Sequence, residues 1–66
     1  MNVPSRDELE KSKVHLEFIT VDGEWERIDT FYDIAKAINY GENLFSSTGT
    51  VHRLVNDNNQ IIELFD

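Results

Sequence analysis

The sequence predicts an α+β fold in which one helix packs on a small antiparallel sheet, in the order β-β-α-β-β. Two pairs of strand-like segments each flank a turn signal: Asp22-Gly23 in the first pair and residues 56–59 in the second. A segment with helical spacing lies between the pairs. The chain has 66 residues and no Cys, so we expect a single domain that no disulfide stabilises.

Residues 14–20 and 24–28 predict the first hairpin, because polar and apolar side chains alternate along 14–20. If Gly23 takes the bulge position of a three-residue turn, Thr20 pairs with Glu24. In that register four pairs of residues face each other: Glu17 with Arg27, His15 with Asp29, Ile19 with Trp25, and Leu16 with Ile28. This arrangement matches charge with charge and apolar with apolar side chains, and we prefer it for that reason.

The segment 30–41 predicts the helix. Thr30 and Asp33 have the spacing of a capping box, and Gly41 is the residue type that closes helices in the left-handed conformation. Four apolar residues fall on one stripe and are expected to face the core: Phe31, Ile34, Ala35 and Ile38. The Asn, Ser and Gly residues that follow, up to position 49, predict a loop.

Residues 50–55 and 60–65 predict the second hairpin, because both are rich in β-branched and apolar side chains. Apolar residues occupy successive positions, so both faces of this hairpin are apolar, and one short helix covers only one of them. The N-terminal arm, the loop around Phe45 or a second copy of the chain would cover the other. We expect a homodimer that tightens as salt screens the repulsion between two acidic copies.

Two parts are expected along the chain: a flexible or weakly helical arm, 1–13, and a single α+β domain, 14–66. Ser5 and Glu8 have capping-box spacing, but only Leu9 is apolar in the following turn. No apolar run approaches the ~20 residues of a membrane span, and the N-terminal segment lacks the apolar core of a signal peptide. We therefore expect a cytoplasmic protein.

The chain carries 13 acidic and 6 basic residues, a formal net charge of −7. This charge repels nucleic acid and anionic membranes, so neither is an expected partner. Solubility is the simplest interpretation of the charge. The alternatives are an acidic face for a basic protein partner and a mimic of DNA, although a mimic requires rows of carboxylates and the acidic residues here are scattered.

No catalytic, cofactor or metal site is expected. The sequence has no Cys and no glycine-rich phosphate loop, and its Ser residues lie in the arm and in a predicted loop. His15 with Asp29, and His52 with Glu63, bring together at most two ligands each, whereas a metal site needs three or more. Polar cross-strand pairs explain both His residues more simply.

The segments 33–38, Asp-Ile-Ala-Lys-Ala-Ile, and 50–56, Thr-Val-His-Arg-Leu-Val-Asn, carry a pattern that resembles winged-helix and helix-turn-helix DNA-binding families. The matching positions are Ile34, Ala35, Thr50, Val51, Arg53 and Leu54. The resemblance implies a recognition helix at 50–55, a wing at 60–65 and a DNA-binding function. This is the alternative to the sheet model of the second hairpin.

Ile19 and Trp25 share the outward face of the predicted first hairpin, beside Glu17 and Arg27. An exposed Trp next to an aliphatic side chain is typical of an interaction hot spot. We therefore predict these four residues as a protein-binding site. The expected function is a non-enzymatic protein-binding or regulatory module, similar in style to small acidic accessory and inhibitor proteins of bacteria and their phages.

Overall fold

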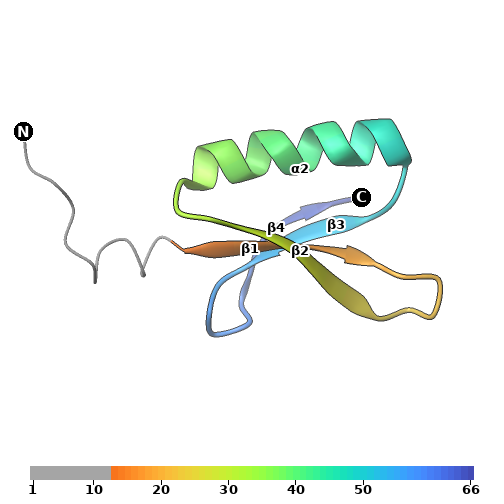
Figure 1. The fold of residues 1–66 in the computed structure, drawn as a ribbon, viewed down its shortest axis with the longest axis horizontal. Coiled ribbons are helices and arrows are strands. Elements are labelled where there is room, and N and C mark those ends of the chain that lie inside the picture. Colours follow the sequence, from red (N-terminus) through yellow and green to blue (C-terminus); the bar gives the residue numbers. More distant parts are fainter. Residues whose placement is uncertain (1–12) are drawn as a thin grey trace, which may run out of the picture.

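The computed structural model describes residues 13–66, which form one helix on a four-stranded antiparallel sheet (Figure 1). The predicted α+β class and the order β-β-α-β-β are confirmed. The elements are β1 (Val14–Ile19), β2 (Trp25–Phe31), α2 (Ile34–Thr48), β3 (His52–Val55) and β4 (Ile61–Phe65). The predicted arm, apart from Lys13, lies outside the described residues.

The strands lie in the order β2-β1-β3-β4, and every neighbouring pair is antiparallel. The two hairpins join through their first strands, β1 and β3, which occupy the centre of the sheet. The helix connects the edge strand β2 to the central strand β3 and runs along one face of the sheet (Figure 1). The two hairpin turns lie at opposite ends of the molecule.

The predicted turn of the first hairpin is confirmed. The backbone N–H of Thr20 donates to the carbonyl of Glu24 at 2.7 Å, and Gly23 adopts a φ of 80°. This left-handed conformation is accessible to glycine at no steric cost. Near the turn the register agrees with expectation, because Ile19 faces Trp25 and Glu17 faces Arg27.

Further from the turn the predicted register is wrong, because β2 contains a β-bulge. The register shifts between Leu16 and Glu17, so that Thr30 faces His15 and Asp29 faces Leu16. The expected pairs of His15 with Asp29 and of Leu16 with Ile28 do not form. A bulge adds one residue to a strand and increases its local twist. Here it lets β2 continue to Phe31, whose ring packs against the core.

The helix begins later than predicted. Its N-cap is Asp33, whose carboxylate accepts a hydrogen bond from the backbone N–H of Lys36 at 3.2 Å. Thr30, the expected cap, lies in β2 instead. The capping box between Thr30 and Asp33 is therefore wrong, because the strand pairing with β1 extends through Thr30 and holds it in an extended conformation.

The helix also continues past its predicted end through the segment that was expected to be a loop. The hydroxyl of Ser47 donates to the carbonyl of Asn43, and that of Thr48 to the carbonyl of Leu44. These bonds satisfy the two hydroxyls within the helix. The helix ends at Gly49, which has a φ of 70° and donates its N–H to the carbonyl of Phe45 at 2.8 Å.

The buried stripe of α2 differs from the predicted one. Ala37 and Gly41 are the buried residues of the helix, whereas Ile34 is 40% exposed. Leu44 and Phe45, in the segment predicted as a loop, pack against the core. Two of the four predicted residues do pack against the core, Ile38 from α2 and Phe31 from β2, whereas Ile34 and Ala35 are exposed. The stripe extends beyond the predicted one because the helix continues to Thr48.

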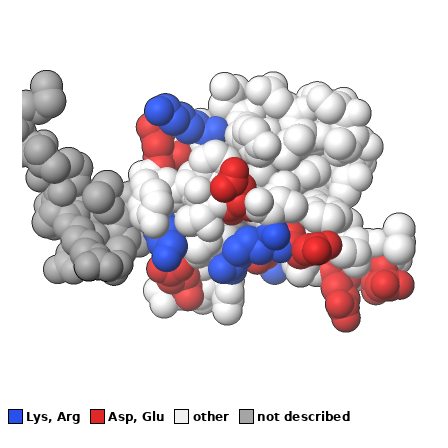
Figure 2. Space-filling view, viewed as in Figure 1, with Lys and Arg blue, Asp and Glu red and all other residues white. Residues whose placement is uncertain are grey.

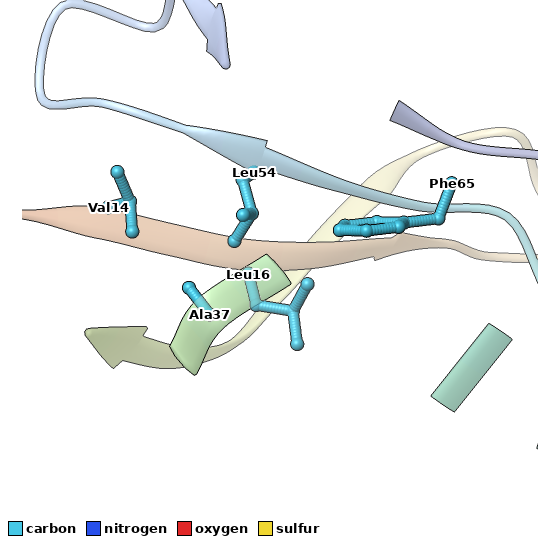
Figure 3. Packing of buried hydrophobic residues seen from close by; sticks show 5 residues of the cluster. All are labelled: Val14, Leu16, Ala37, Leu54 and Phe65. Atoms are coloured by element: carbon cyan, nitrogen blue, oxygen red, sulfur yellow. The ribbon is translucent and has the colours of Figure 1, made fainter. Parts of the chain in front are cut away.

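The core lies between α2 and the two central strands. Figure 3 shows side chains from three strands and the helix meeting in this layer. Its buried residues are Val14, Leu16, Ala37, Leu54 and Phe65. At Gly41 the helix backbone lies so close to Phe65 that an added Cβ would be 2.5 Å from the ring.

The second hairpin is confirmed, with strands slightly shorter than predicted and a turn in which Asn59 adopts a φ of 61°. Residues 52–55 form a strand rather than a recognition helix. The helix-turn-helix arrangement implied by the sequence resemblance is therefore wrong for this part of the chain. Within residues 13–66 no helix combines the length and the apolar character needed to cross a membrane.

Candidate functional site on the open face of the sheet

The sheet face opposite α2, which we call the open face, is covered by no other element within residues 13–66 (Figure 1). Leu16 and Leu54 pair with each other and point to α2, so their neighbours along each strand point to the open face. All four strands contribute residues to this face: Trp25, Arg27 and Thr30 of β2, His15, Glu17 and Ile19 of β1, Arg53 and Val55 of β3, and Ile61 and Leu64 of β4.

Glu17 lies at the centre of the open face between two arginines from the neighbouring strands. Its side chain is only 9% exposed. Oε2 accepts hydrogen bonds from Nε and Nη2 of Arg27, at 3.3 and 3.2 Å, and Oε1 accepts one from Nε of Arg53 at 2.9 Å. Both oxygens of a carboxylate that is largely removed from water are thereby paired. One negative and two positive charges leave this row with a net charge of +1.

The guanidinium of Arg53 stacks on the indole ring of Trp25, with Cζ 4.1 Å from the ring centroid. The negative face of the ring attracts the cation. Trp25 also pairs with Ile19 across the first hairpin. It therefore connects the charged centre of the open face with an apolar area near the turn.

A second polar group crosses the open face at His15, which is buried. Its Nδ1 lies 2.8 Å from Oγ1 of Thr30 and its Nε2 lies 2.6 Å from Oδ1 of Asp57. The hydrogen bond with His15 is the largest cause of a lowered pKa at Asp57; partial desolvation opposes it, and the nearby charges of Lys13 and Arg27 lower the pKa further. The contact fastens the β3–β4 turn to the central strand β1.

The four residues predicted to bind a protein, Ile19, Trp25, Glu17 and Arg27, all lie on the open face. Sequence reasoning missed Arg53, which completes the row with Glu17. Alternation along β3 was its only signal. Its position beside Glu17 depends on the pairing of β1 with β3, and that pairing brings together segments far apart in the sequence.

Exposed aliphatic side chains lie along the edge strand β4. Ile61 is 57% exposed and Leu64 45% exposed on the open face, and Ile62 between them is 39% exposed. The prediction that the second hairpin is apolar on both faces is confirmed, because Leu54 and Phe65 of the same hairpin are buried on the helix side. The edge strand itself contains neither Lys nor Pro, the residues that often protect such edges from pairing.

A pocket of about 260 Å³ lies on the opposite side of the sheet, near the C-terminal end of α2. Its lining is mainly apolar and includes Phe18, Ile28 and Leu44, with buried His52 beside them. Nδ1 of His52 bonds the carbonyl of Thr50 at 2.6 Å. Nδ1 of His52 is therefore occupied by a hydrogen bond to the local backbone.

The chain of contacts from Asp57 through His15 to Thr30 has the order carboxylate, imidazole, hydroxyl that hydrolases use to activate a nucleophile. It lies on the open face, whereas the pocket lies on the helix side, so the pocket cannot present a substrate to Thr30. Residues 13–66 also contain no group of three or more His, Cys, Asp or Glu placed to hold a metal ion.

Comparisons of the chain with family models, with curated proteins and with solved structures found no match. The geometry of the open face is therefore the basis for assigning a function.

Proposed function

We propose that the protein is a non-enzymatic protein-binding or regulatory module that contacts its partner through the open face of the sheet. The observation that carries the proposal is the group formed by Glu17, Arg27, Arg53 and Trp25, with Ile19 beside it. Trp and Arg are the residue types most enriched in interaction hot spots. Here they are held in fixed positions by contacts with each other.

A protein partner fits this surface better than a small molecule. Small ligands bind in concave pockets that bury most of their surface, whereas the open face is one side of a sheet to which all four strands contribute. It offers a charged centre, an aromatic side chain beside it and aliphatic residues such as Leu64 at the edge. Mixed surfaces of this kind are typical of protein interfaces.

Duplex DNA fits the whole molecule poorly. The net charge is −7, and binding to phosphates depends on Lys and Arg side chains. Among residues 13–66 the basic side chains are Lys13, Arg27, Lys36 and Arg53. In Figure 2 acidic side chains lie beside the basic ones over the sheet, while the visible side of the helix is largely uncharged.

The proposal is tested by capture from a lysate of the source cell with three immobilised proteins: the wild type, Ile19→Asp and Ile34→Asp. Ile19 lies on the open face, and Ile34 lies in the first turn of α2, which covers the other face of the sheet, with 40% of its surface exposed. The two variants therefore introduce the same charge on opposite sides of the molecule. Denaturation midpoints of all three are measured first, so that only folded proteins are compared.

We expect at least one protein that the wild type and Ile34→Asp retain equally and that Ile19→Asp retains about tenfold less or worse, since a hot spot contributes about 2 kcal/mol. Titration of that protein in purified form should give the same ranking. Equal recovery of every captured protein by all three baits would refute the assignment of the open face.

A further inference from the structure

We infer that Arg27 and Arg53 form a receptor for a carboxylate group on an extended, otherwise apolar segment of the partner protein. The inference rests on the proposed function and names the chemistry of the partner at the same face. It differs from the expectation of a basic partner, which follows from the net charge of the whole chain. The open face has the opposite local sign at its centre.

The local charge follows from the count of groups around Glu17. Its single negative charge is shared between two guanidinium groups, so one positive charge remains uncompensated in the row. The neighbouring acidic residue Glu26 faces Phe18, which lines the pocket on the helix side, and so lies on the other face. Asp57 in the adjoining turn bonds His15 and adds one negative charge, but Lys13 lies near enough to offset it, so the count around the row remains +1.

Arg53 is held in position before any partner binds. Its Nε donates to Oε1 of Glu17 at 2.9 Å, and its Cζ lies 4.1 Å from the centroid of the Trp25 ring. Its two terminal nitrogens make no hydrogen bond to any of residues 13–66. A guanidinium fixed in this way loses little conformational entropy when it binds a carboxylate, and two parallel N–H groups match the two oxygens.

Arg53 is also partly shielded from water, since its side chain is 23% exposed, compared with 46% for Arg27. Exposed ion pairs contribute little, because water screens them. A carboxylate that binds at Arg53 while apolar side chains cover Trp25 and Leu64 would be screened less. Trp25 and Leu64 both lie beside Arg53, Leu64 on the adjacent strand. We therefore expect the rest of the bound segment to be apolar.

Three synthetic peptides of equal length test the inference: each is an otherwise apolar segment of Val and Leu with one central residue, which is Glu, Gln or Lys. Binding is followed by NMR from the Nε–H signal of Arg53 and the indole N–H signal of Trp25. We expect saturable shifts with the Glu peptide alone, although the net charge of the protein repels it. Equal shifts with the Gln peptide, or none with the Glu peptide at millimolar concentration, would overturn the inference.

Two variants of equal charge separate local from global electrostatics. Arg53→Gln leaves Glu17 paired with Arg27, so the buried carboxylate keeps a partner, and we expect about tenfold weaker binding of the Glu peptide or worse. Lys36→Gln removes the same charge from the helix, and we expect no more than a twofold change. The same loss in both variants would mean that net charge alone governs binding, and would refute the receptor.

Capture of the partner by Ile19→Asp and by Arg53→Gln tests the proposed function and this inference separately. If Ile19→Asp abolishes capture and Arg53→Gln leaves it unchanged, the open face is the interface but the carboxylate receptor is wrong. Mixed-sequence duplex DNA serves as a last probe. Binding of DNA at Arg53 tighter than about 10⁻⁴ M at physiological salt would assign the cationic row to phosphates and overturn the inference.

Discussion

Replacing Gly41 with Ala tests the close approach of the helix to the sheet. On an exposed helix surface the substitution would stabilise the protein by about 0.8–1.0 kcal/mol, which is the difference in helix propensity. Here the new Cβ would lie 2.5 Å from Cε2 and 2.6 Å from Cζ of Phe65. Carbon atoms pack at about 3.5–4.0 Å, so the ring must move by about 1 Å.

Phe65 has little room for that movement, because it is 6% exposed and packs in the core with Leu16 and Leu54. Overpacking of this kind destabilises proteins by about 1–3 kcal/mol. The gain in propensity offsets part of the loss, so we expect Gly41→Ala to lower the free energy of unfolding by about 1 kcal/mol. A domain of this size has a total of about 3–10 kcal/mol.

Urea denaturation followed by far-ultraviolet circular dichroism measures the effect, and two further variants identify its cause. In a Phe65→Leu background the clash is relieved, so Gly41→Ala should become neutral or stabilising, with a coupling energy of about 1–2 kcal/mol. Gly49→Ala has no atom near the new Cβ but a φ of 70°, and should lose about 1–2 kcal/mol from backbone strain alone. Stabilisation by Gly41→Ala in the wild type, without coupling to residue 65, would refute the reasoning.

Three other predictions concern the cap, the acidic side of the pH range and self-association. Asp33→Ala should lose about 0.5–2 kcal/mol of stability through the missing helix cap, and an unchanged denaturation midpoint would show that the helix does not depend on Asp33. The folded pKa of Asp57 lies below its ordinary value of 3.8, so its contribution is complete above that value and is lost as the pH falls through the folded pKa. Midpoints measured between about pH 5 and pH 2 should therefore fall less steeply for Asp57→Asn than for the wild type; parallel curves would contradict the assignment. We also propose that two copies pair through β4, more tightly as salt rises, and that Leu64→Lys prevents it; sedimentation equilibrium showing monomers at every concentration and salt would exclude the dimer.

The turns were predictable because their signals are local. Gly23 and Asn59 adopt positive φ values where the sequence places residues that tolerate them. The pairs closest to the first turn, such as Ile19 with Trp25, follow directly from the turn type. The bulge further along β2 has no local signal. It arises because the strand must bring Phe31 to the core while keeping Thr30 beside His15.

The helix was predictable in existence but not in extent. Ser47, Thr48 and their neighbours have a composition typical of loops, yet they are helical because Leu44 and Phe45 pack on the core and hold that turn in place. Gly41 was predicted to end the helix, but it lies inside α2, where its lack of a side chain lets the helix approach Phe65. At both positions, packing between α2 and the sheet outweighed the local preference of the residues for a loop or a helix end.

Most of the candidate site could be predicted because it lies within one hairpin. Glu17, Ile19, Trp25 and Arg27 come from β1 and β2, whose register follows from a short turn. Arg53 comes from β3, and its contact with Glu17 depends on a pairing between separate hairpins. No alternation pattern specifies which strands of two hairpins become neighbours.

That pairing of β1 with β3 also has a consequence for how the chain folds. Leu16 faces Leu54 across the centre of the sheet, although β2 and the whole of α2 lie between them in the chain. The two ends of this long segment must meet before either leucine is buried, and the entropy of closing such a loop slows folding. An isolated hairpin is marginal in water, so neither half supplies a stable template for the other. We expect folding in one slow cooperative step, with no smaller fragment of residues 13–66 that folds alone.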